Sequence, residues 1–119
     1  MPFGAATRAY HRPIVTVQQA APGSNVIKVD PDVLTTRGAN NTIDWKIDPN
    51  LANHQFLWWP SNGIVFVDAN APFRCWKQNE QLFRCEGGRD DNVTMKYKYM
   101  VTLDGTPVVP PLDPFVVNN

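Results

Sequence analysis

This 119-residue chain has no long apolar run, a formal net charge of zero and only two cysteines. No apolar run approaches the roughly 20 residues that cross a bilayer, so no membrane-spanning helix is expected. Eleven Lys and Arg residues balance eleven Asp and Glu residues, which leaves no long-range field for nucleic acid or an acidic membrane surface. The N-terminal segment 1–13 lacks the apolar stretch of a signal peptide, so we expect a cytoplasmic protein.

Residues that carry common enzyme chemistry are also few. Ser24 and Ser61 are the only serines, and neither lies in a G-x-S-x-G motif. The two histidines are far apart, and no histidine follows Cys85 in the order that a blue-copper loop needs. Zinc usually takes four ligands in short paired spacings, which this chain does not offer. The sequence therefore predicts no enzyme, no cofactor and no metal site.

Eleven prolines and seven glycines divide the chain into short segments, as is typical of many strands joined by turns. The stretch from Val93 to Asp104 organises these segments. It places apolar or aromatic residues at every second position: Val93, Met95, Tyr97, Tyr99, Val101 and Leu103. This alternation predicts a half-buried β-strand. We expect it to be the long central strand of an antiparallel sheet.

Other alternating or apolar segments predict the strands that cover it. Trp45 should be a core anchor in its strand, because a buried Trp brings a large apolar area. Pro31 lacks an N–H donor, so the strand before it should bend or lie at a sheet edge. The four-residue turn 60–63 favours a hairpin between the segments on either side of it. The expected strands are 14–19, 26–30, 33–36, 42–48, 55–59, 64–68, 93–104 and 115–117.

These segments predict an all-β fold. We expect a single antiparallel β-sandwich, with an immunoglobulin-like or cupredoxin-like Greek-key topology, because turn signals recur every 8–12 residues or so. Residues 1–13 are expected to form a flexible N-terminal arm, and residues 14–119 the β-sandwich domain. The expected core residues are Ile43, Trp45, Phe56, Trp58, Phe66, Tyr97 and Tyr99.

The two cysteines lie in a segment with a short internal symmetry. Phe73-Arg74-Cys75 recurs as Phe83-Arg84-Cys85, with its centre at Glu80. A symmetric hairpin would therefore place Cys75 opposite Cys85, where a disulfide can form. A reducing compartment would instead keep both thiols free. The sequence leaves both states open.

Tryptophans supply the candidate binding residues. Trp58 and Trp59 are adjacent, so on a strand they face opposite sides, and one of them should be exposed or covered by a partner. An exposed Trp near Asn53 and Gln55 can stack on a sugar ring or anchor a protein interface. Trp76 is a further candidate contact, with Arg74 and Arg84 on either side of it in the hairpin.

One resemblance extends from about Val26 to the C-terminus. It is carried by the order Trp45, Gly63-Ile64, Phe73, Phe83, Tyr97-Lys98-Tyr99 and Leu112-Asp113-Pro114. This order resembles small uncharacterised bacterial β-sandwich proteins with an immunoglobulin-like or cupredoxin-like outline. The resemblance implies the fold and no catalytic residues, and the missing copper ligands depart from true cupredoxins.

Three functions remain open from the sequence. The first is a non-enzymatic protein-interaction or structural module that docks on a protein partner or self-associates. The second is a small-ligand binding module, with carbohydrate as the ligand class, that uses an exposed Trp. The third is a thiol or metal redox protein that uses Cys75 and Cys85.

Overall fold

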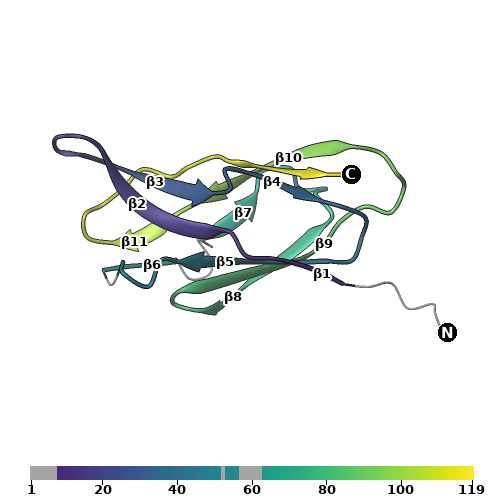
Figure 1. Cartoon of the computed structure of the whole chain (residues 1–119), viewed down its shortest axis with the longest axis horizontal. Coiled ribbons are helices and arrows are strands. Elements are labelled where there is room, and N and C mark those ends of the chain that lie inside the picture. The colour runs from purple at the N-terminus through teal and green to yellow at the C-terminus, as the bar shows by residue number, and fades with distance from the viewer. Residues whose placement is uncertain (1–7, 52, 57–62) are drawn as a thin grey trace.

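The computed structural model describes residues 8–51, 53–56 and 63–119. These ranges form twelve strands and contain no helix that could cross a membrane (Figure 1). The strands are β1 (Ala9–His11), β2 (Ile14–Ala21), β3 (Ser24–Asp30), β4 (Val33–Thr36), β5 (Asn41–Ile47), β6 (His54–Phe56), β7 (Ile64–Phe66), β8 (Phe73–Asn79), β9 (Leu82–Gly87), β10 (Met95–Val101), β11 (Leu103–Gly105) and β12 (Phe115–Asn118).

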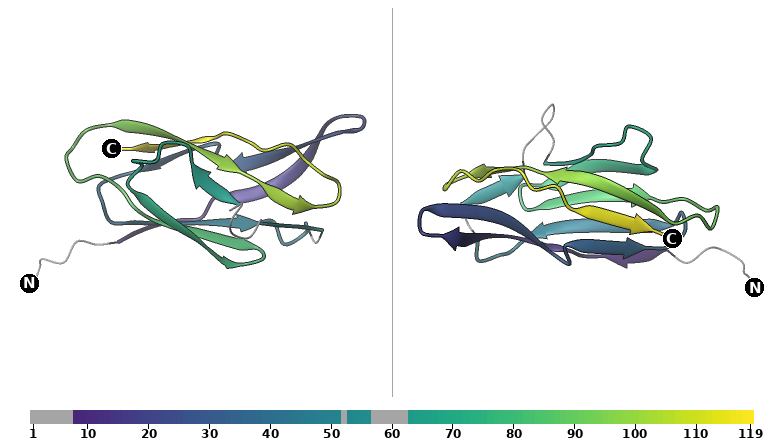
Figure 2. Two further views of the ribbon diagram at one scale, coloured as in Figure 1. Left: turned by 180° about the vertical axis from the view of Figure 1, so that it is seen from behind. Right: turned by 90° about the horizontal axis from the view of Figure 1, so that it is seen from above.

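The larger of two main sheets has the strand order β3-β2-β5-β9-β8, and β1 also pairs with β5. The second main sheet has four strands in the order β4-β12-β10-β7, and Figure 2 shows β12 beside β10 in both of its views. A separate pair joins β11 to β6. We call the first two the large sheet and the four-stranded sheet.

Both main sheets are mixed, so the prediction of a purely antiparallel arrangement is wrong. In the large sheet, β1 and β2 both run parallel to β5. In the four-stranded sheet, β12 runs parallel to β4 and antiparallel to β10. Alternation of side chains reports which face of a strand is buried, but it carries no information on the direction of the neighbouring strand.

The chain passes from one main sheet to the other at Pro31. This residue follows β3, an edge strand of the large sheet, and precedes β4, an edge strand of the four-stranded sheet. The peptide bond between Asp30 and Pro31 is cis. The prediction that Pro31 bends a strand or marks an edge is confirmed, because both strands beside it lie at edges.

Two predictions differ from the structure: one concerns the pairing of the segments 55–59 and 64–68, and the other the length of the strand 93–104. Where the structure describes the segments 55–59 and 64–68, they do not pair with each other as a hairpin, because β6 pairs with β11 and β7 pairs with β10. The expected central strand from Val93 to Asp104 is split, because β10 ends at Val101 and β11 begins at Leu103. Thr102 lies at the break and donates its backbone N–H to Gly63 at 2.8 Å. This bond takes the place of a ladder bond, and the chain then continues in another sheet.

The core contains residues of both main sheets. Trp45 of β5 and Tyr99 of β10 are fully buried, and their ring centroids are 5.0 Å apart. Of the other expected core residues, Ile43, Phe56 and Tyr97 are buried and Phe66 is half-buried, while Trp58 lies outside the described residues. The described core also includes Val15, Ile27, Val29, Leu34, Ile47, Ile64, Phe83, Cys85, Val101, Leu103, Val109 and Val116.

Part of the expected flexible arm, residues 1–13, forms a strand. Residues Ala9 to His11 form β1, which pairs with Asn41 to Ile43 of β5. After a short connection β2 continues beside the same strand, where Ile14 pairs with Lys46. The hairpin of β2 and β3 then reaches one end of the molecule (Figure 1).

Candidate functional site

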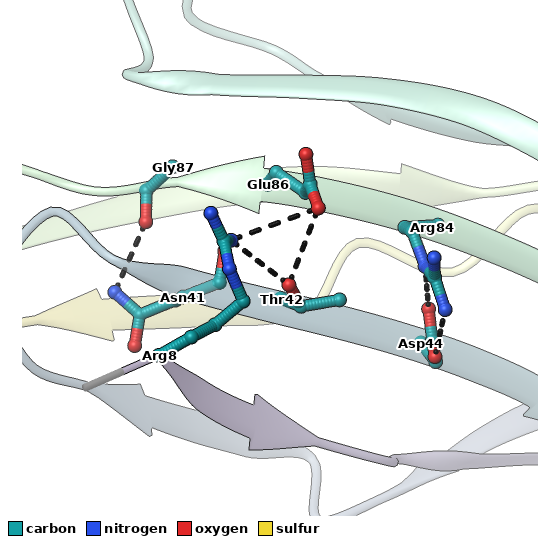
Figure 3. A network of polar contacts seen from close by, with 7 residues as sticks. All are labelled: Arg8, Asn41, Thr42, Asp44, Arg84, Glu86 and Gly87. Carbon is teal, nitrogen blue, oxygen red and sulfur yellow. Dashed lines mark hydrogen bonds and ion pairs between the residues drawn. The ribbon is translucent and has the colours of Figure 1, made fainter.

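The outward surface of the large sheet carries two polar residues of β5, Thr42 and Asp44, that are nevertheless buried. Asp44 on β5 is only 5% exposed, and it pairs in register with Arg84 on β9. The Arg84 guanidinium donates two hydrogen bonds to the carboxylate, at 2.7 and 2.9 Å (Figure 3). These bonds, first among the causes, raise the pKa of Arg84 above its ordinary value. The pair is bidentate, which fixes the plane of the guanidinium.

A second polar group joins the N-terminal segment to the same surface. Arg8 donates a 3.0 Å hydrogen bond to the Thr42 hydroxyl and lies 3.6 Å from a Glu86 carboxylate oxygen. Thr42 in turn donates to the same oxygen of Glu86 at 3.3 Å (Figure 3). These contacts connect the residue before β1 to β5 and β9.

Asn41 is a structural clamp rather than a ligand site. Its side-chain amide is buried and donates to the backbone carbonyls of Arg37, Gly38 and Gly87 at 3.0–3.1 Å. Its side-chain carbonyl accepts a 3.1 Å hydrogen bond from His11. Every polar atom of this side chain is therefore used to hold the loop after β4 against the ends of β1 and β9.

Next to the Asp44–Arg84 pair lies a groove of about 380 Å³, which we call the cationic groove. It is lined by Arg12, Asp44, Lys46, Asn79, Gln81, Leu82 and Arg84. Three of these side chains are cationic and one is an acid. Arg12 and Lys46 are exposed, and within the described ranges neither side chain has a hydrogen-bond or ion-pair partner.

Three predicted binding residues come together on this surface. Trp76 pairs in register with Arg84, and Arg74 pairs with Glu86, so these side chains share one face of the sheet. Trp76 is 38% exposed. Arg12 and Lys46 were not predicted. Lys46 stands on the polar side of its alternating segment, but only the parallel pairing of β2 with β5 brings residues near Arg12 beside it.

The other predicted binding residues lie elsewhere in the fold or outside the described residues. Trp58 and Trp59 fall outside the described residues. Asn53 lines a smaller cavity of about 220 Å³, together with Val17, Asn25, Asn50, Leu51, His54, Thr106 and Pro107. Gln55 donates a long 3.5 Å hydrogen bond to Asp104. His54 is buried, and its Nε2 donates to the Pro107 carbonyl at 2.7 Å, while its Nδ1 has no partner within the described chain.

The cysteines form a disulfide across the β8–β9 hairpin. Cys75 pairs with Cys85 in register, as the symmetry of the segment predicts, and their Cα atoms are 4.0 Å apart. Cys85 is buried and Cys75 is half-buried. In the residues that the structure describes, no group of three or more His, Cys, Asp or Glu side chains is placed to hold a metal ion.

The outward surface of the four-stranded sheet has a different character. Its outward positions alternate with the buried Tyr97, Tyr99, Val101 and Val116. We call it the apolar face, and it consists of Val33, Thr35, Val65, Val67, Lys96, Lys98, Met100, Phe115 and Val117. Six of these nine side chains are apolar and none is an acid. Val67 is 58% exposed, Val33 47% and Val65 46%.

Two lysines are the only charged residues of the apolar face. The ammonium group of Lys96 lies 4.1 Å from the centre of the Phe115 ring, and that of Lys98 lies 5.6 Å from it. Neither lysine has an acidic partner within the described ranges. The face therefore presents apolar area and uncompensated positive charge.

Comparison with known proteins adds no assignment: no protein-family model matches the chain, and a search of curated proteins finds no match.

Proposed function

We propose that this chain is a non-enzymatic interaction module, built as one immunoglobulin-like Greek-key sandwich, that docks on a protein partner through the apolar face. The order β8-β9-β5 corresponds to the D, E and B strands of an immunoglobulin sandwich, and β7-β10-β12 corresponds to C, F and G. The contact between Trp45 and Tyr99 supports packing of one sheet on the other. In this scheme β1 and β2 are an addition beside the B strand.

The observation that carries the proposal is the composition of the apolar face. Outward positions of a solvated sheet are usually polar, and contiguous exposed apolar area marks interaction surfaces. Here exposed valines from β4 and β7 lie on either side of Met100 and Phe115. A partner would cover this area and exclude water from it.

Charge complementarity indicates the chemistry of the partner. Lys96 and Lys98 have no acid beside them on the face, so a partner surface with apolar side chains and carboxylates would compensate them. A second copy that used the same face would bring four lysines together without a carboxylate. We therefore expect the isolated chain to be a monomer and the partner to be a different, acidic protein surface.

Site-specific photo-cross-linking in the native host tests this proposal. A photoreactive residue at Thr35 or Val67 should give a discrete adduct, and one at Lys28, which lies on the large sheet, should not. The adduct should be lost when Lys96→Glu and Lys98→Glu are combined, although the thermal midpoint stays unchanged. Equal adducts from both sheets, or adducts that survive charge reversal, would overturn the proposal.

Sedimentation velocity tests whether a second copy of the chain, and not an acidic partner, occupies the apolar face. A dimer that forms at micromolar concentration and disappears on Val67→Lys would make a second copy the occupant and contradict the acidic partner. A monomer at every concentration agrees with the proposal.

A further inference from the structure

The cationic groove lies on the large sheet, away from the apolar face. We propose that this groove binds an acidic saccharide, with the carboxylate of a uronic acid unit held by Arg12, Lys46 and Arg84. The inference does not depend on the apolar face, because the groove is formed by β5, β8 and β9 with the segment before β2.

The charge of the groove favours an anionic ligand. Among the described residues, Asp44 is the only acid that lines the groove, and Arg84 already occupies both of its carboxylate oxygens. Arg12 and Lys46 therefore face the groove without a counter-charge from the described part of the chain. An anionic ligand would supply that counter-charge.

The Arg84 guanidinium is preorganised by its bonds to Asp44. The Arg84 guanidinium has five N–H groups, and its bonds to Asp44 use one at Nε and one at Nη2. The remaining N–H groups keep a fixed direction because the buried carboxylate holds the guanidinium plane. A ligand carboxylate can thus accept hydrogen bonds from a donor that is already ordered, which lowers the entropic cost of binding.

The uncharged residues of the groove lining suit a sugar. The Gln81 side chain donates to the His54 carbonyl at 2.9 Å, which leaves its own carbonyl oxygen as an acceptor. The Asn79 carbonyl oxygen accepts from the Gln81 backbone N–H at 2.9 Å, and its amide NH₂ can donate to hydroxyl groups. Leu82 supplies an apolar patch in the groove, and Trp76 presents an indole beside Arg84. Amides for hydroxyls together with apolar surface for a ring are what a sugar requires.

Size favours a short saccharide over nucleic acid or an extended acidic peptide. A volume of about 380 Å³ lies at the small end of ligand sites and suits one or two sugar rings. Nucleic-acid binding draws on several phosphate contacts along a strand, and the groove has three cations in one place.

Isothermal titration calorimetry with uronate oligosaccharides tests the site. The probes are trimers of galacturonate, glucuronate and mannuronate, and the methyl ester of each trimer serves as the matched neutral ligand. At least one free acid should bind, and its ester should bind at least tenfold more weakly. Failure of all three acids to bind at millimolar concentration would overturn the proposal.

Paired variants locate the binding. Arg12→Gln combined with Lys46→Gln should lower the affinity for the uronate trimer at least tenfold. Arg37→Gln combined with Lys28→Gln removes the same charge from exposed positions outside the groove and should change affinity less than twofold. Trp76→Ala should lower the affinity for the free acid and the affinity for its methyl ester by the same factor. Equal losses in both double variants would assign the effect to overall charge and contradict the site.

Two competitor ligands decide the chemical class. A hexaglutamate peptide and a single-stranded hexanucleotide should each bind at least tenfold more weakly than the uronate. If either binds as tightly, the groove recognises negative charge in general and the saccharide assignment is wrong. None of these results bears on the apolar face, so this site and the proposed docking function can fail separately.

Discussion

The indole N–H of Trp45 donates a 3.1 Å hydrogen bond to the hydroxyl of Tyr99. The first residue belongs to β5 of the large sheet and the second to β10 of the four-stranded sheet. Both side chains are fully buried, and water cannot reach either polar atom. A buried indole N–H needs an acceptor, and this hydroxyl is the one that it meets. The bond therefore couples the two sheets in a directional way that apolar packing alone does not provide.

Replacement Tyr99→Phe tests that coupling. It keeps the ring but leaves the Trp45 N–H buried without an acceptor, which should lower the free energy of unfolding by about 1–3 kcal/mol. Urea denaturation followed by tryptophan fluorescence measures the change. Tyr10→Phe is the matched control, because Tyr10 is 66% exposed and should change stability by less than about 0.5 kcal/mol. Equal effects of the two substitutions would show that the bond adds nothing.

The same tyrosine should make the protein sensitive to alkali. Burial disfavours the phenolate and raises the pKa of Tyr99 to about 12, above the ordinary value of about 10 in an unfolded chain. As the pH rises, Tyr99 therefore ionises in the unfolded state before it does so in the folded state. The stability that the neutral Tyr99 side chain contributes is complete below pH 10 and is lost as the pH rises toward 12. The stability difference between wild type and Tyr99→Phe should shrink over that interval. A constant difference from pH 9 to pH 12 would contradict the prediction.

The disulfide between Cys75 and Cys85 should contribute measurable stability. It closes a loop with a sequence separation of 10, for which loop-closure entropy predicts about 3 kcal/mol. The double substitution Cys75→Ala and Cys85→Ala should lower the free energy of unfolding by roughly this amount. Reduction of the wild type should have a similar effect. A fully oxidised wild type that is no more stable than the double variant would contradict the prediction.

The oxidation state in cells also bears on location. A cytoplasmic protein, as expected from the sequence, would keep both thiols reduced, whereas an oxidising compartment preserves the bridge. The intact mass of protein taken from its host under non-reducing conditions distinguishes the two states by two hydrogens. Retention of the bridge would replace the cytoplasmic expectation with an oxidising compartment.

Patterns within one strand predicted much of the fold. The alternation around Trp45 and Tyr99 correctly gave two strands and their buried faces, and the repeat about Glu80 gave the register of Cys75 with Cys85. Pairing between distant strands was not predicted. Nothing local indicates that β6 pairs with β11, or that β4 runs parallel to β12, because these choices depend on the whole chain.

The same distinction applies to the candidate sites. The placement of Trp76, Arg74 and Arg84 side by side could be predicted because they lie on one hairpin, where register follows from the turn. The unpaired cations Arg12 and Lys46 meet only after β2 has paired with β5, so their groove has no signature in the sequence. The apolar face was missed for a related reason, since it joins outward residues of four strands.

Loss of the Asn41 amide should destabilise the loop after β4. Asn41→Ala removes the donor of three backbone carbonyls, those of Arg37, Gly38 and Gly87. Because the site is buried, the cost should be about 3 kcal/mol, measured by chemical denaturation. Asn50→Ala is the control, because Asn50 is exposed and its side chain forms no hydrogen bond in the described structure. A loss below about 1 kcal/mol would mean that water replaces the amide.

Gly88 lies against this clamp, and its lack of a side chain is required there. Its φ is +128°, and a Cβ atom would lie 2.0 Å from the Gly38 carbonyl oxygen and 2.8 Å from the Asn41 amide nitrogen. Gly88→Ala should therefore cost more than backbone conformation alone, about 3 kcal/mol or more. Gly23→Ala separates the two effects, because Gly23 also has a positive φ, +76°, but no atom within 4 Å of the added carbon. That variant should lose about 1 kcal/mol. Equal losses in urea denaturation would show that the loop after β4 moves to admit a methyl group, and that Asn41 does not hold it closely against β9.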